Sequence, residues 1–146
     1  MAKFVYKMQN ILEIKYKIEE QRKVEFSKAN EAYNIEVKKL EDFVSRKYSY
    51  EEKLRNLYNE NLKISEIRNT IEAIDKMKEI IKMQIIEVNK AMKIVDETRE
   101  MLNEAMLERK TQEKLREKAF EEFLLEIKAD EDKEVDELVS FKYGNR

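Results

Sequence analysis

Apolar residues recur along residues 67–106 in alternating steps of four and three. The residues between them are mostly charged or polar. A mean spacing of 3.5 residues keeps one narrow stripe of a helix toward one neighbouring helix, as is typical of a left-handed coiled coil. The predicted stripe consists of Ile67, Ile71, Ile74, Lys78, Ile81, Ile85, Val88, Met92, Val95, Arg99, Leu102 and Met106.

A second stripe of the same spacing precedes the first one. Residues 4–18 also carry apolar side chains at helical spacing, and the polar residues 19–23 then shift the phase of the pattern. A narrow stripe cannot bury itself, so the two stripes are expected to pack on each other. The second stripe consists of Phe26, Ala29, Tyr33, Glu36, Leu40, Phe43, Lys47, Tyr50, Leu54 and Leu57.

The two stripes align when the numbers of paired residues sum to 124 or 125. Leu57 then meets Ile67, and the two lysines within the stripes, Lys47 and Lys78, fall in the same layer. We therefore predict an all-α fold, a long antiparallel two-helix coiled-coil hairpin.

The predicted hairpin is a single domain that fills residues 1–146. Helix 1 is predicted to span about residues 3–59, the turn about 60–65 and helix 2 about 66–142. Asn59 and Asn61 weaken the helical pattern before the turn. The alternative is one uninterrupted helix that pairs between two chains.

The composition agrees with a long helix, because 42% of the residues are charged and the chain has no Pro and one Gly. The net charge is −2, from 30 basic and 32 acidic residues, which argues against nucleic acid as the main partner. No apolar run approaches the roughly 18 residues of a membrane span, so we expect no direct membrane insertion and a cytoplasmic protein.

Catalytic chemistry is not expected. The chain has no His and no Cys, so it lacks the usual bases, thiol nucleophiles and zinc ligands. Its only glycine is Gly144, so there is no glycine-rich phosphate loop. We predict that the protein is not an enzyme and has no metal site or cofactor.

Some apolar residues lie off the predicted stripes and are candidates for partner contact, although scattered surface hydrophobes are an equal alternative. Whether the candidates on the two helices join into one surface stays open. They are Val37, Val44 and Tyr48 on helix 1, and Ala73, Met77, Ile80 and Gln84 on helix 2.

Two stretches near the end of the chain are less regular. Residues 108–114 contain no large apolar side chain, so they form either a solvated stretch of helix or a contact zone for a partner. Residues 121–146 carry nine acidic and four basic residues, yet apolar residues still recur near helical spacing. This overhang is predicted either to be frayed or to bind a partner.

Three motifs resemble the FliJ family of flagellar export proteins. Residues 4–12 read FVYKMQNIL and are similar to its Phe-x-Phe/Tyr-x-Leu/Met-Gln-x-Val/Ile-Leu opening. Residues 109–115, RKTQEKL, resemble its Arg-Lys-x-x-Glu-x-Leu segment, and residues 133–138, KEVDEL, resemble its Lys-x-x-Asp-Glu-hydrophobic ending. The three motifs occur in the family's order and reach both ends of the chain.

The resemblance implies a non-enzymatic component of the bacterial flagellar type III export apparatus, similar to the central stalk of rotary ATPases. The implied partners are the export ATPase hexamer, the cytosolic linker of the membrane export gate protein and export chaperones. The implied location is the cytoplasm, peripherally on the inner face of the cell membrane at the flagellar base.

The resemblance also implies two sets of contact residues. The gate linker would contact the off-stripe residues Val37, Val44, Tyr48, Ala73, Met77, Ile80 and Gln84. The ATPase ring would contact Phe4, Arg109, Lys110, Phe120 and Phe123. The alternatives are a generic coiled-coil adaptor or chaperone, and the equivalent stalk protein of a virulence-type secretion system.

Overall fold

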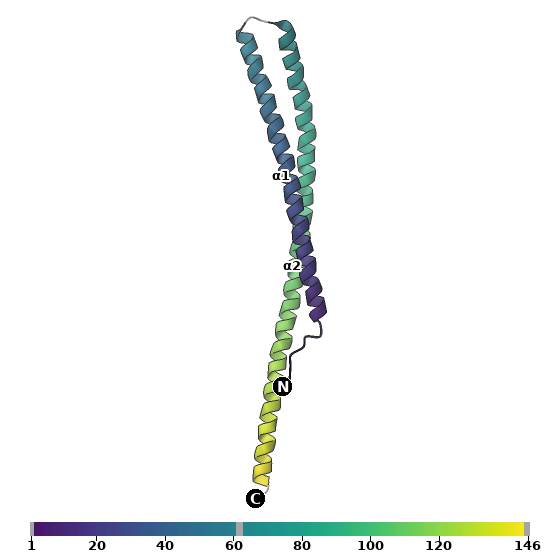
Figure 1. Cartoon of the computed structure of the whole chain (residues 1–146), viewed down its shortest axis with the longest axis vertical. Coiled ribbons are helices and arrows are strands. Elements are labelled where there is room, and N and C mark those ends of the chain that lie inside the picture. Colours follow the sequence, from purple (N-terminus) through teal and green to yellow (C-terminus); the bar gives the residue numbers. More distant parts are fainter. Residues whose placement is uncertain (1, 61–62, 145–146) are drawn as a thin grey trace. The chain divides into compact units, whose positions relative to one another are not determined.

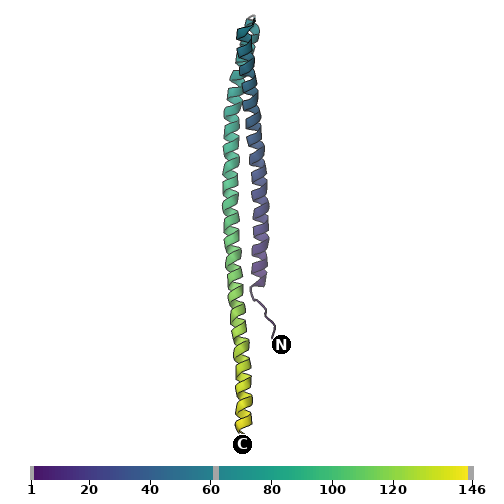
Figure 2. The same cartoon turned by 90° about the vertical axis from the view of Figure 1, so that its left-hand side faces the viewer.

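The protein consists of two long helices joined by a short connection (Figure 1). The computed structural model describes residues 2–60 and 63–144. Helix α1 spans Gln9–Asn59, helix α2 spans Ile64–Gly144, and the described residues contain no strand. Figure 2 shows the two helices from a second direction. The predicted all-α helical hairpin is confirmed.

Helix α1 begins at Gln9, so the prediction that it starts near residue 3 is wrong. Residues 2–6 have no helical structure, and the backbone N–H of Gln9 donates to the carbonyl of Tyr6 at 3.1 Å. The first α-helical bond runs from the N–H of Leu12 to the carbonyl of Met8. The helical spacing of Phe4 had suggested an earlier start, but this ring instead packs on phenylalanines of α2.

Helix α2 begins at Ile64, within the predicted turn of residues 60–65. The backbone N–H of Ile67 donates to the carbonyl of Lys63 at 3.1 Å, so Lys63 stands at the N-cap position. Residues 61 and 62, on which part of the turn prediction falls, lie outside the described residues.

Contacts divide the chain into two compact units, each built from a segment of α1 and a segment of α2. We call residues 23–101 the hairpin unit, and residues 2–22 together with 102–144 the terminal unit. Each unit is described by itself. The single-domain assignment stays a prediction.

In the hairpin unit, the α1 stripe lies where the sequence placed it. Every predicted position from Phe26 to Leu57 is buried or half-buried. On α2, half of the predicted positions are also in the seam. These are Ile67, Ile74, Ile81, Val88 and Val95.

The other predicted positions of α2 are wrong by one residue. The seam contains Thr70, Met77, Gln84, Ala91 and Thr98 in place of Ile71, Lys78, Ile85, Met92 and Arg99. The side chain of Met77 is 4% exposed, whereas that of Ile85 is 43% exposed. The seam therefore steps from each shared position by three and then four residues, which is the usual a and d pattern of a heptad.

Side-chain volume explains this choice of phase. In the 124 register, Tyr33 of α1 faces Ala91 of α2, and Phe26 faces Thr98. Small α2 residues opposite large α1 residues fill the seam without overpacking. Ile71, Ile85 and Met92 of the rejected phase are more apolar than Thr70, Gln84 and Ala91, which is why the sequence alone favoured them.

The predicted layer of two lysines does not exist. Lys78 is exposed, whereas Lys47 is half-buried at its seam position and pairs with Glu51 at 3.4 Å. In the same register Lys47 faces Met77, whose side chain can accommodate the lysine stem. The hairpin unit thus has a single lysine in this layer.

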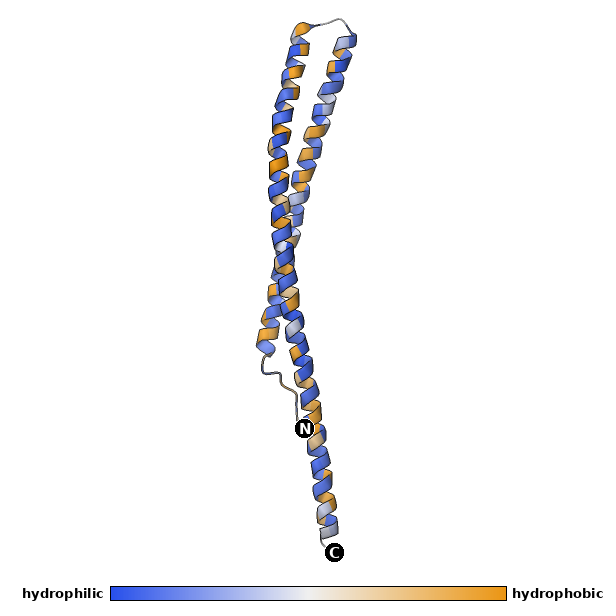
Figure 3. Ribbon diagram, turned by 180° about the vertical axis from the view of Figure 1, so that it is seen from behind, coloured by the Kyte–Doolittle hydropathy of each residue, from blue (hydrophilic) through white to orange (hydrophobic). Residues whose placement is uncertain are grey.

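The terminal unit continues the heptad with polar residues. On α1, Leu12, Lys15, Glu19 and Arg22 follow the same three-and-four steps and lead to Phe26 without the predicted phase shift. On α2, the corresponding positions are Leu102, Ala105, Arg109 and Gln112. Figure 3 shows hydrophilic and hydrophobic residues intermingled along both helices.

Candidate partner-binding site

Three phenylalanines form an aromatic cluster in the terminal unit. The ring of Phe4 lies 5.1 Å from that of Phe120 in an edge-to-face arrangement and 5.4 Å from that of Phe123. The guanidinium of Arg116 lies 5.8 Å from the centre of the Phe4 ring. The structure therefore brings together three of the five residues predicted to contact an ATPase ring.

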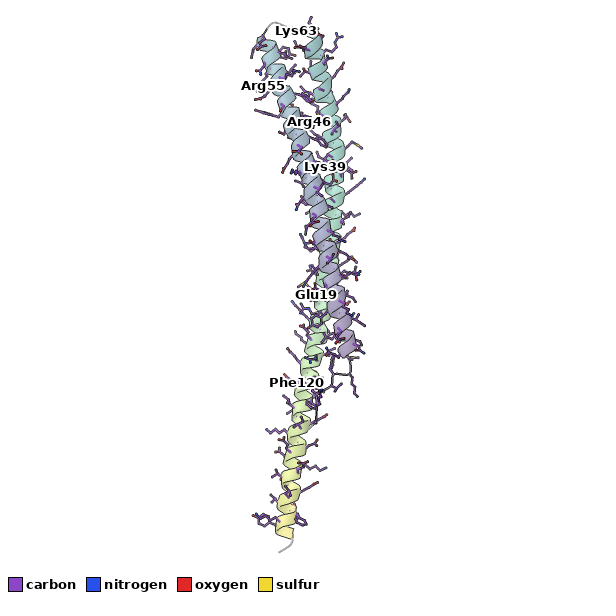
Figure 4. The ribbon with its side chains drawn as sticks, in the orientation of Figure 1. Glu19, Lys39, Arg46, Arg55, Lys63 and Phe120 are labelled. Atoms are coloured by element: carbon purple, nitrogen blue, oxygen red, sulfur yellow. The ribbon has the colours of Figure 1, made fainter. Side chains whose placement is uncertain are left out.

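The cluster is accessible from outside the chain. The side chain of Phe120, labelled in Figure 4, is 43% exposed, and Leu124 and Leu125 next to it on α2 are also exposed. Beyond them, α2 continues to Gly144 with exposed apolar residues such as Leu138 and Phe141. Several exposed apolar side chains along one helix are typical of a surface that binds a partner protein.

Arg109, the fourth predicted residue, is held inside the seam. Its guanidinium forms an ion pair with Glu19 of α1, and its Nη1 lies 3.1 Å from Oε2 of Glu113. The side chains of Arg109 and Glu19 are only 18% and 6% exposed. The hydrogen bond from Arg109 to Glu19 raises the pKa of the guanidinium. Lys110, the fifth residue, is exposed.

Four of the polar residues 108–114 pair with α1 or with the segment before it. Lys15 pairs with Glu108 at 2.9 Å, Tyr16 donates a hydrogen bond to Glu113, and the hydroxyl of Tyr6 lies 3.5 Å from Gln112. The bond from Tyr16 and the charge of Arg109 lower the pKa of the Glu113 carboxyl. Polar pairing thus replaces apolar packing in this stretch.

In the hairpin unit, Val44 and Tyr48 share a shallow groove on α1. The groove is also lined by Leu40, Glu41 and Ser45, and Val44 and Tyr48 are 49% and 55% exposed. Val37, one heptad before Val44, is half-buried. These three predicted gate-linker residues lie on one flank of α1.

The four predicted residues on α2 are not one surface. Met77 and Gln84, expected off the seam, are 4% and 8% exposed and lie within it. Ile80 is exposed and shares a second groove with Phe43 and Met83. The error follows from the heptad phase, since a shift by one residue moves these two side chains from a flank into the seam.

The two predicted flanks do not join. Ala73 of α2 lines a small cleft together with Lys53 of α1. Lys53 lies three residues after the seam residue Tyr50. Val44 follows its seam neighbour Phe43 by one residue. On a helix these two offsets place side chains on opposite sides of the seam. Met83, which the sequence analysis missed, belongs with Ile80, and its spacing of three residues from Ile80 was the available signal.

Gln84 has a structural role instead. Its Nε2 donates to the carbonyl of Glu36 at 2.8 Å and to Oε2 of the same residue at 2.6 Å. These bonds cross from α2 to α1 and join adjacent layers of the seam. The bond from Gln84 lowers the pKa of the Glu36 carboxyl.

Residues 2–60 and 63–144 offer neither a metal cluster nor a membrane-spanning helix. No group of three or more His, Cys, Asp or Glu side chains in these ranges could hold a metal ion. No helix there is both long enough and apolar enough to cross a membrane.

Two long helices that pack against each other, with exposed apolar residues on their flanks, define an all-α helical hairpin. The model of the family described as flagellar FliJ protein matches residues 4–146, so the chain belongs to the FliJ family. Membership places it in flagellar type III protein export. The search of curated proteins gives no match, and the search of solved structures gives none either.

Proposed function

We propose that this protein is a non-enzymatic component of the flagellar export apparatus that couples the export ATPase ring to the membrane export gate. In this role the aromatic cluster of the terminal unit and the following part of α2 engage the ring. The observation that carries the proposal is the exposed apolar surface from Phe120 to Phe141 within a chain of the FliJ family.

The charge of the terminal unit and the asymmetry of a two-helix hairpin support this unit as the part that binds the ring. Residues 121–146 have a net charge of −5, and Lys110 supplies an exposed cation nearby in the sequence. An asymmetric helical hairpin inside a six-fold ring would contact the six subunits differently. A partner changes an equilibrium only through such differential contacts, so this asymmetry could link nucleotide turnover to binding at the gate.

The hairpin unit is the proposed binding surface for the cytosolic linker of the gate protein. The groove that contains Val44 and Tyr48 offers exposed apolar area in the middle of α1. Met77 and Gln84 are omitted from this surface because both are buried in the seam. Export chaperones are proposed as further partners, and binding to the gate would hold the protein peripherally at the flagellar base.

Turnover by the cognate export ATPase tests the proposal. We expect the full-length protein to stimulate turnover, and we expect a Phe120→Ala/Phe123→Ala variant to lose most of this stimulation at equal concentration. A Val24→Ala variant is the matched control, because Val24 is an exposed apolar residue of α1 in the other unit. If wild type and double variant stimulate equally while both remain helical, ring binding through this cluster is wrong.

A further inference from the structure

The segment before α1 lies against α2 as an extended strap. Phe4 contacts Phe120 and Phe123, the hydroxyl of Tyr6 approaches Gln112, and residues 4–8 line a cavity together with α2. The strap has no regular secondary structure before residue 7, so no backbone ladder holds it to α2. Its attachment therefore depends on a few side-chain contacts.

The surface beneath the strap has a specific composition, and we call it the cradle. Apolar contacts come from aromatic rings, and the guanidinium of Arg116 lies over the ring of Phe4. Two carboxylates, Glu122 and Glu126, line the same cavity. The cradle consists of Arg116, Ala119, Phe120, Glu122, Phe123 and Glu126.

The strap complements the cradle in charge as well as in shape. Phe4 and Tyr6 lie between the basic residues Lys3 and Lys7, and Lys7 lines the cavity that contains the two glutamates. An aromatic residue flanked by bases is the chemistry that an aromatic, acidic helix face recognises. The complementarity resides in side chains of a short segment, so another segment with the same residues could take its place.

We propose that the cradle is a docking site for a short extended segment with an aromatic residue flanked by Lys or Arg. In the free chain, residues 2–8 occupy this site reversibly. A partner segment of the same chemistry displaces the strap and places its own aromatic side chain where Phe4 lies. This inference rests on the proposed function only for the identity of the partner that carries such a segment.

Tethering explains how the strap would control the site. A short tether gives its own segment an effective concentration of about 1 mM. If the same segment binds as a free peptide with a Kd of about 100 µM, the cradle is covered about ten times more often than it is open. A competing segment then binds the intact chain about tenfold more weakly than a chain whose strap is detached.

The test uses a fluorescent peptide of residues 2–10 of this chain and the full-length protein. We expect fluorescence anisotropy to show that a Phe4→Ala variant, or a chain lacking residues 2–7, binds the peptide at least about tenfold more tightly than wild type does. The same peptide with Phe4 replaced by Ala is the control and should bind none of the proteins. Adding Phe123→Ala to the Phe4→Ala variant should abolish binding.

Equal affinity of wild type and of both open variants for the peptide would contradict the proposal that residues 2–8 cover the cradle. No binding by either open variant, with helicity by circular dichroism unchanged, would contradict the proposed docking site.

A second measurement uses the natural absence of Cys in this chain. A disulfide between Val5→Cys and Glu122→Cys, which replace residues that line the same cavity, should prevent peptide binding until it is reduced, and peptide binding by the oxidised protein would contradict the inference. None of these readouts involves the ATPase, so a failure of the proposed ring contact would be seen separately.

Discussion

Arg109 of α2 and Glu19 of α1 form an ion pair at seam positions of the terminal unit, where a coiled coil usually has apolar residues. Glu113, four residues after Arg109, completes the contacts of the guanidinium at 3.1 Å. A half-buried charge is tolerated in such a position only when its partner is present. We therefore expect the pair to specify the register of α1 on α2 more than it adds stability.

Removing one partner of this pair should destabilise the terminal unit. We expect Glu19→Ala to lower the Tm by about 5 °C, because the Arg109 guanidinium loses its main partner in the seam. Thermal unfolding followed by circular dichroism measures the change. Glu108→Ala, which removes the more exposed pair with Lys15, is the control and should shift the Tm by less than about 2 °C. Equal shifts in the two variants would show that the Arg109 pair has no special role.

The heptad phase of α2 can be tested by neighbouring substitutions. Met77→Ala should lower the free energy of unfolding by about 2–4 kcal/mol, because it removes a side chain that is almost fully buried. Ile85→Ala, at a half-exposed position of the phase that the structure rejects, should cost less than about 1 kcal/mol. Urea denaturation of both variants measures the difference. A larger loss in the Ile85 variant would restore the phase suggested by apolar residues alone.

The sequence was sufficient to predict the hairpin and the pairing of its ends. Leu57 and Ile67 define the register near the connection, and the contact of Phe4 with Phe120 agrees with a sum of 124 at the other end. A 3.5-residue repeat determines this much because a narrow apolar stripe is buried only against a second helix. The same repeat cannot distinguish two heptad phases that differ by one residue. Ile71 and Ile85 lie next to the seam, and Thr70 and Gln84, one residue earlier, lie within it.

The candidate sites were predicted less completely, and for the same reason. Phe4, Phe120 and Phe123 were named together from the family resemblance, and the structure brings their rings into contact, while their binding to the ATPase ring stays a prediction. Arg109 was expected to contact the ATPase ring from the family resemblance, and its partner Glu19 belonged to the polar run that was predicted to shift the phase. The cost of an isolated buried charge becomes visible only when both helices are considered in register.

The Glu36 carboxyl should make stability depend on pH at the acid end. Its pKa is lowered from 4.5, first by the hydrogen bond from Gln84 and then by Lys39, so the ionised form is favoured in the folded chain. The resulting stabilisation is fully present above pH 4.5 and is lost as the pH falls through the lowered pKa.

The matching variant is Glu36→Gln, which cannot ionise. We expect its Tm to lie roughly 3 °C below that of wild type at pH 7, and we expect the gap to narrow as the pH is lowered to 3. Thermal unfolding at a series of pH values measures the gap. Glu97→Gln, on an exposed part of α2, is the control. A gap that is constant from pH 7 to pH 3 would show that ionisation of Glu36 does not contribute.

The groove with Val44 and Tyr48 should account for binding to the gate linker. Val44→Asp places a charge in an apolar contact without touching the seam, so we expect about tenfold weaker binding to a purified linker fragment of the gate protein and an almost unchanged Tm. Isothermal titration calorimetry measures the affinity. Ile35→Asp is the matched control, because Ile35 is similarly exposed on α1 but lies outside this groove. Equal affinities of the two variants, or a selective loss in the control, would place the linker on a different face of the hairpin unit.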